Sequence, residues 1–237
     1  HSGMDIDKGR MNANQLMGRV LASLPESFDI AYIKGGNKDN AIPRDAEALL
    51  AFDSEDAEKR AEHVLDSMLV DLNAEICSAE PAFTFTWETA LLPAHLMDRE
   101  TAAALIQLLY LSPNGVLSRN VKQGGFVVTS SNLGVVRMTE SGAQVVFSPR
   151  SSSASLQAEI KQRLSMLGKL LGFTVSCRGE DPGWNYSEHS PIRDYFMSSY
   201  QALFGQELKL EAIHAGLECG LFQAKLPGLD AIAIGPT

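Results

Sequence analysis

The spacing of apolar residues along the chain predicts a regular succession of helices and strands. Between residues 54 and 76, apolar side chains recur every three or four positions, which is the spacing of one helix face. Residues 83–87 alternate between apolar and polar, which is typical of a strand. The same patterns predict helices at 14–24, 54–76, 98–111 and 156–171, and strands at 28–34, 46–52, 83–87, 126–138, 143–147 and 173–177.

These predicted elements fall into two similar halves. Residues 11–88 and residues 98–178 each contain a helix, two strands, a long amphipathic helix and a closing strand. We therefore expect an α/β fold of α+β character, made of two repeated units. Each unit resembles a split βαβ sandwich whose helices lie on one face of its sheet.

The succession of elements changes after the turn-rich segment 180–184. Ser190 and Pro191 are typical of a helix start. The predicted order is then a helix to residue 204, a strand at 209–213, a helix at 218–224 and a strand at 231–234. Strands that alternate with helices favour a parallel layer. Because residues 185–237 are too few to cover both faces of such a sheet, we expect them to be one part of a larger domain.

Composition narrows the classes of protein that the chain can represent. The 237 residues are 45% hydrophobic and 21% charged, which is typical of a globular protein and argues against disorder. No apolar run is long enough to span a membrane. The net charge of −9 disfavours binding to nucleic-acid phosphates. Three cysteines without a CxxC pair suit a reducing cytoplasm.

Local motifs alone reveal no metal site and leave one region of interest open. None of the five histidines lies in an HxxxH, HxD or HExxH pattern. The segment 213–220 lies where a strand passes into a helix, a common ligand position in α/β sheets. It is also compatible with a tight turn with a capping Glu218 and a buried Cys219. A third alternative makes Cys219 a nucleophile activated by His214, although no third orienting group is evident.

Several motifs resemble one enzyme family. HAGLECGLF (residues 214–222), KLPGLD (225–230) and IGPT (234–237) closely resemble the aminoacyl-histidine dipeptidases of the peptidase D type. These are di-zinc exopeptidases related to carnosinase, peptidase V, peptidase T and aminoacylase. Shorter matches occur in the same order along the chain: HSG (1–3), NAN (12–14), NAIPRD (40–45), PNGV (113–116), SNLGVV (131–136) and PGW (182–184).

The resemblance implies a division of the chain. Residues 1–184 correspond to the family's inserted lid and dimerisation domain, which suits the repeated units. Residues 185–237 correspond to the C-terminal part of the catalytic α/β domain of a zinc exopeptidase, which is incomplete here. The resemblance also implies two zinc ions whose ligands lie outside this sequence. We therefore expect this polypeptide alone to be inactive.

The resemblance further implies roles for five residues. In the family, a zinc-activated water attacks a dipeptide carbonyl with a glutamate as general base. His1 supports the developing oxyanion, and Asn40 and Arg150 hold the free carboxylate of the substrate. Gly216 and Glu218 line the other side of the pocket. Without the resemblance, Asn40 is better explained as a turn residue, and Arg150 as a surface arginine beside a serine-rich helix start.

Three functional hypotheses follow. The first is a cytoplasmic metallo-dipeptidase that hydrolyses Xaa-His and related dipeptides and forms a homodimer through its lid. The second is an amidohydrolase that acts on N-acyl amino acids. The third is a non-catalytic binding or dimerisation module that never carried metal ligands. An HxD motif before this sequence and a histidine after it would favour the peptidase.

Overall fold

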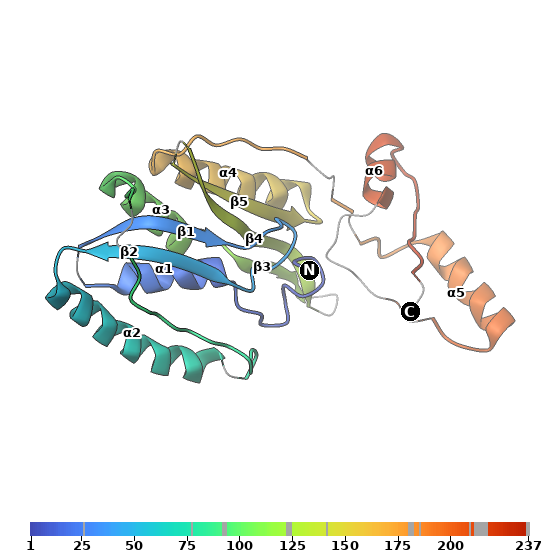
Figure 1. The fold of residues 1–237 in the computed structure, drawn as a ribbon. Coiled ribbons are helices and arrows are strands. Elements are labelled where there is room, and N and C mark those ends of the chain that lie inside the picture. The colour runs from blue at the N-terminus through green and yellow to red at the C-terminus, as the bar shows by residue number, and fades with distance from the viewer. Residues whose placement is uncertain are drawn as a thin grey trace.

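The computed structural model describes residues 1–25, 27–76, 78–91, 94–121, 125–140, 142–179, 183–184, 186–208, 210 and 218–235. Five strands and four helices form the main body, and two further helices follow near the C-terminus (Figure 1). The elements in chain order are α1 (Ala13–Ser23), β1 (Phe28–Gly35), β2 (Ala46–Phe52), α2 (Glu55–Ile76), α3 (Arg99–Leu111), β3 (Gly115–Asn120), β4 (Phe126–Thr139), β5 (Gly142–Ser151), α4 (Ala154–Leu170), α5 (Pro191–Phe204) and α6 (Glu218–Lys225).

The strands of both halves join in one antiparallel sheet. Its order is β2-β1-β4-β3, and β5 pairs with β4 as well (Figure 1). Strand β4 pairs with β5 from Thr129 to Thr139, and on its other edge it pairs first with β3 and then with β1. The halves meet where Gly35 of β1 lies opposite Val136 of β4. The sheet is therefore continuous across the two predicted units.

Helices α1 and α3 pack against each other and supply most of the core on one face of the sheet. Leu21 of α1 and Leu105 and Leu109 of α3 lie with Ile33 of β1 and Leu133 of β4 in one buried cluster. The close contact needs a glycine, because a Cβ at Gly18 would lie 2.7 Å from the Cβ of Leu109. Burial of these aliphatic side chains is the main force that holds the helices on the sheet.

A second cluster fastens the long helix α2 to α1. It consists of Val20 of α1 and Met68, Leu72 and Ile76 of α2. Phe83 and Phe85, from the segment that follows α2, pack against the same cluster. The alternation at residues 83–87 thus reflects an extended segment whose apolar side packs on a helix.

The predicted strands at 83–87, 173–177 and 231–234 are wrong, since none of these described segments is a strand. Residues 173–177 pass along α4, where a Cβ at Gly168 would lie 2.7 Å from Cγ2 of Val175. Period-two alternation indicates an extended backbone with one buried side, but pairing requires a free sheet edge nearby. Without these closing strands, neither half forms a split βαβ unit within the described residues.

The other strands predicted before residue 152 and the helices agree with the structure within a few residues, with one omission. Strand β3 was not predicted, because it lies directly after Pro113 and Asn114 and shows no clear alternation. Its first residue, Gly115, has a φ of +83°, a value that glycine adopts at little cost. The second half is therefore α3-β3-β4-β5-α4, with one strand more than α1-β1-β2-α2.

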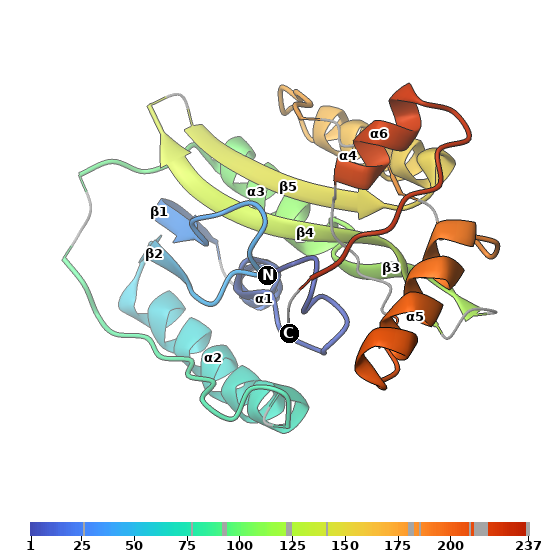
Figure 2. The same cartoon turned by 90° about the vertical axis from the view of Figure 1, so that its right-hand side faces the viewer.

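The C-terminal helices α5 and α6 lie to one side of the sheet (Figures 1 and 2). Helix α5 begins at Pro191, and its cap Ser190 accepts a hydrogen bond from Arg193 N at 3.3 Å. The carboxylate of Asp230 accepts from Ser190 Oγ at 2.7 Å and from Ile192 N at 2.9 Å. The predicted strand at 209–213 lies almost wholly outside the described residues. The described helices include none that combines the length and apolarity needed to cross a membrane.

Candidate functional site

Four asparagines, at positions 12, 14, 114 and 132, gather where strand β4 changes its partner. Strand β3 ends its pairing at Gly115 opposite Ser131, and β1 starts opposite Val136, so no strand lies beside residues 132–135 on that edge within the described chain. Side chains take over the backbone bonds there. Leu133 N donates to Asn114 Oδ1 at 3.0 Å, and Leu133 O accepts from Asn12 Nδ2 at 3.1 Å and Asn14 Nδ2 at 3.2 Å. These bonds satisfy backbone groups that would otherwise be buried without partners.

The loop that carries Asn40 lies directly on this part of β4. A Cβ on Gly134 would lie 2.6 Å from Asp39 O, and a Cβ on Gly36 would lie 2.0 Å from Gly134 O. Asn132 Nδ2 donates to both Asp39 O and Ala41 O at 2.7 Å. The glycines allow the loop to approach, and the buried amide holds it in place.

The N-terminal segment binds the same loop and brings His1 close to Asn40. Ser2 is buried, and both its N and its Oγ donate to Asn40 O, at 2.9 and 3.1 Å. His1 Nδ1 accepts a hydrogen bond from Gly3 N at 3.1 Å. A neutral imidazole that accepts at Nδ1 carries its proton on Nε2. His1 can therefore donate a hydrogen bond from Nε2, as an oxyanion donor must.

Charges at the N-terminus hold this segment in shape. Lys8 Nζ lies 2.8 Å from Asp5 Oδ1. The hydrogen bond from Lys8 is the largest cause that lowers the pKa of Asp5 below its usual value of 3.8. Asp5 is thus ionised at neutral pH, and it stabilises the turn that positions His1.

Arg150 lies near the end of β5 and shares a cavity with Asn40. It lies opposite Ser130 of β4, and its Nε is buried without a hydrogen-bond partner among the described residues. Both Asn40 and Arg150 line an open cavity of about 1160 Å³, which continues between β5 and α4. A guanidinium in such a place can bind a carboxylate through two parallel hydrogen bonds.

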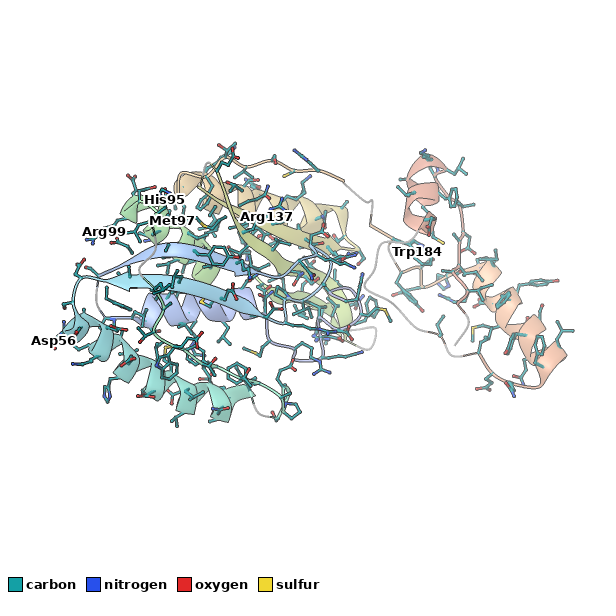
Figure 3. All side chains as sticks on the ribbon, in the orientation of Figure 1. Asp56, His95, Met97, Arg99, Arg137 and Trp184 are labelled. Carbon is teal, nitrogen blue, oxygen red and sulfur yellow. The ribbon has the colours of Figure 1, made fainter. Side chains whose placement is uncertain are left out.

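Gly183 and Trp184 of the PGW motif line the same cavity. A Cβ on Gly183 would lie 2.6 Å from Ser152 O, so only glycine fits against the end of β5. Trp184 also lines the cavity, and Figure 3 shows it where the chain has left the sheet toward the C-terminal helices. Trp184 thus lies at the boundary between the sheet and the C-terminal segment, where Tyr186 also packs on Phe126 of β4.

The remaining predicted residues do not join this group. Glu218 is exposed at the first position of α6 and does not line the cavity. Gly216 and His214 lie outside the described residues. Cys219 is half-buried, and its thiol lies 3.8 Å from Ile232 O. Among the residues that the structure describes, no three His, Cys, Asp or Glu side chains gather where they could hold a metal ion.

Comparison with known proteins connects this site to a family. Residues 1–74 match the family model called Peptidase dimerisation domain. The cytosol non-specific dipeptidase of Escherichia coli K12 is 37% identical over 244 aligned residues, which cover 100% of this chain and 49% of that protein. The crystal structure of aminoacylhistidine dipeptidase from Vibrio alginolyticus matches with a TM-score of 0.90 at 34% identity, again over 100% of this chain and 49% of that one.

The chain is similar to these two dipeptidases over its whole length. It spans about half the length of the two relatives that it matches. The resemblance read from the motifs and the mixed α/β fold class are therefore confirmed. The roles of His1, Asn40, Arg150, Gly216 and Glu218 stay predictions, as does the boundary at residue 184.

Sequence reasoning did not find the role of the buried asparagines. The motifs NAN, PNG and SNLG supported the dipeptidase resemblance, but no function was assigned to Asn12, Asn114 or Asn132. The available signal was asparagine recurring in short motifs far apart in the chain. That signal does not reveal which asparagines meet, because turns and caps use the same residues.

Proposed function

We propose that the chain supplies the lid and the substrate-carboxylate site of a metal-dependent dipeptidase. In this proposal Arg150 and Asn40 bind the free carboxylate of the substrate, and Nε2 of His1 donates a hydrogen bond to the oxyanion that forms at the scissile carbonyl. One observation carries the proposal. Residues 40 and 150, far apart in the sequence, line one cavity in which the buried Nε of Arg150 has no partner among the described residues.

A free carboxylate distinguishes exopeptidase substrates from internal peptide bonds. Arg150 extends from a sheet strand, so its backbone is fixed by the pairing of β5 with β4. The carbonyls of Asp39, Asn40 and Ala41 all accept hydrogen bonds, so the side chain of Asn40 is presented from a rigid backbone. A site of this kind recognises the end of a short peptide before bond cleavage occurs.

The proposal includes two zinc ions, as in the family that the motifs resemble. When bound, the metal would activate the attacking water. The described residues do not hold such a site, since they include no group of metal-binding side chains. This chain's part in the reaction is therefore to bind and orient the substrate. Glu218 and Gly216 remain proposed lining residues of the opposite wall.

The experiment compares wild type and Arg150→Lys in a polypeptide of the relatives' full length. Each is assayed with a free-acid dipeptide and with its C-terminal amide. We expect Arg150→Lys to lower kcat/KM for the free acid by about ten- to a thousandfold, since lysine cannot form the bidentate pair. The amide should be affected much less. An equal loss with both substrates would show that Arg150 does not bind the carboxylate.

A second candidate is an amidohydrolase for N-acyl amino acids, because these substrates also carry a free carboxylate. The cavity suits both kinds of substrate equally. The two hypotheses therefore differ only in what they expect at the N-terminal side of the substrate. Parallel assays with an Xaa-His dipeptide and the matching N-acetyl amino acid separate the two. Preference for the free amino group supports the dipeptidase.

The proposal also includes a homodimer in the cytoplasm. The match to a peptidase dimerisation domain covers residues 1–74, which contain α1, β1, β2 and most of α2. The E. coli relative is named a cytosol dipeptidase. Sedimentation equilibrium of the chain should give twice the monomer mass, and a purely monomeric species at high concentration would contradict the dimer.

A further inference from the structure

Three successive carbonyls of the loop around Asn40 are held from two directions. Asp39 O and Ala41 O both accept from Asn132 Nδ2, while Asn40 O accepts from Ser2 N and Oγ. The loop also closes on itself, since Ala41 N donates to Lys38 O at 3.3 Å. The backbone on either side of Asn40 therefore has little freedom to turn.

Asn132 is suited to hold this loop because its own orientation is determined. The residue is 1% exposed, and its Oδ1 accepts from Asn12 Nδ2 at 3.3 Å. The amide group must therefore point its NH₂ at the loop. Each of its two N–H groups meets one carbonyl at 2.7 Å, which is a short distance for a neutral N–H···O bond.

Asn132 also stands beside the strand segment that carries Arg150. It lies opposite Ser148 of β5, and Ser130, two positions earlier on β4, lies opposite Arg150. Positions two apart on a strand share a face. One strand thus anchors the Asn40 loop at residue 132 and pairs with Arg150 at residue 130.

We propose that Asn132 is the positioning residue of the carboxylate site, acting through the Asn40 loop without touching substrate. This inference rests on the proposed function, because a positioning residue presupposes the carboxylate site. Whether Asn132 holds the Asn40 loop in place can be tested without that function. Asn132 sets where Asn40 stands relative to Arg150, and Asn12 keeps Asn132 in the required orientation.

The test uses Asn132→Asp, which preserves shape but replaces the NH₂ donor with an oxygen that faces two carbonyls. The matched control is Asn114→Asp, the same change in the same network at a residue without a hydrogen bond to the loop in the described structure. Because Asn132→Asp can weaken folding, Gly134→Ala is the second variant. Its Cβ would displace Asp39 and leave the Asn132 amide intact.

The first measurement is hydrogen–deuterium exchange of the 237-residue chain. Asn132→Asp and Gly134→Ala should each speed exchange at Ala41 N and Ser2 N by about tenfold or more, since local opening is then easier. Asn114→Asp should leave both amides within about twofold of wild type. Unchanged exchange at Ala41 and Ser2 in Asn132→Asp would overturn the proposal.

The second measurement is kinetic, in the full-length polypeptide. Asn132→Asp should raise KM for a free-acid dipeptide by about five- to fiftyfold while kcat changes by less than about threefold. KM for the amide substrate should not rise in the same way. An equal rise for both substrates, or the same rise in Asn114→Asp, would refute a positioning role. If Arg150→Lys also fails to distinguish acid from amide, the proposed function fails, while the exchange result still decides the role of Asn132.

Discussion

Substitution of Asn12 tests whether the asparagine network stabilises the fold. Asn12 is 5% exposed and has two separate tasks. Its Oδ1 caps α1 by accepting from Asn14 N and Gln15 N, both at 3.1 Å. Its Nδ2 donates to Asn114 Oδ1, Asn132 Oδ1 and Leu133 O. Two different substitutions can separate these tasks.

The expected magnitude follows from the partners that each change leaves behind. Loss of the helix cap costs about 1 kcal/mol. After Asn12→Ala, Leu133 O still accepts a hydrogen bond from Asn14 Nδ2, and Asn114 Oδ1 still accepts one from Leu133 N. Among the described residues, Asn132 Oδ1 is then left without a donor. A buried acceptor without a donor costs about 1–3 kcal/mol. Asn12→Ala should therefore lower the free energy of unfolding by about 2–4 kcal/mol, and Asn12→Ser, which keeps the cap, by about 1 kcal/mol less.

The measurement is urea unfolding of the chain followed by far-ultraviolet circular dichroism. Asn12→Ala should also lower Tm by about 4–16 °C for a chain of this size. The control is Asn73→Ala on α2, an exposed asparagine that bonds only within its helix and should change stability by less than about 0.5 kcal/mol. A loss below about 1 kcal/mol in Asn12→Ala would refute the network's structural role. Equal losses in Asn12→Ala and Asn12→Ser would show that the cap contributes nothing.

Three further predictions follow from other parts of the structure. In a polypeptide of the relatives' full length, His1→Ala should lower kcat more than it raises KM, because an oxyanion donor acts only once charge develops. Steady-state kinetics in which KM alone changed would contradict this. The carboxyl of Asp5 should titrate by NMR with a pKa below its usual 3.8, because it pairs with Lys8. This ion pair stabilises the N-terminal turn above about pH 4 and is lost as the pH falls through the lowered pKa. A midpoint near 3.8 would show that the pair does not form. Leu72→Ala, at a side chain with no exposed area, should lower the free energy of unfolding by about 2–5 kcal/mol in urea, whereas Val70→Ala on the exposed side of α2 should change it by less than about 0.5 kcal/mol.

Local order was largely predictable because it depends on neighbours in the sequence. The acidic start and apolar stripe of residues 54–76 predicted α2, and Asp98 predicted the cap of α3, where it accepts from Thr101 N at 2.9 Å. Burial of one helix face and satisfaction of the first amides are local requirements. The motifs likewise indicated the dipeptidase family, because they were read as short stretches of sequence.

Pairing between distant segments was less predictable. Phe83–Trp87 alternates as a strand does, yet its aromatic side packs on α2 and the segment joins no strand. The alternation of residues 173–177 led to the same error. Alternation specifies which side of an extended segment is buried, whereas pairing depends on which sheet edge lies beside it.

Within the described part of the chain, the sequence by itself determined the helices, four of the five strands and the α/β class, and its motifs pointed to the dipeptidases. Only the tertiary structure decided that both halves share one sheet through Gly35 and Val136, and that Asn12, Asn114 and Asn132 meet at the gap between β3 and β1. It also placed Asn40 and Arg150 on one cavity. The physical reason is range: a helix cap or an apolar stripe is satisfied within a few residues, whereas a buried amide finds its partners only after distant strands have aligned.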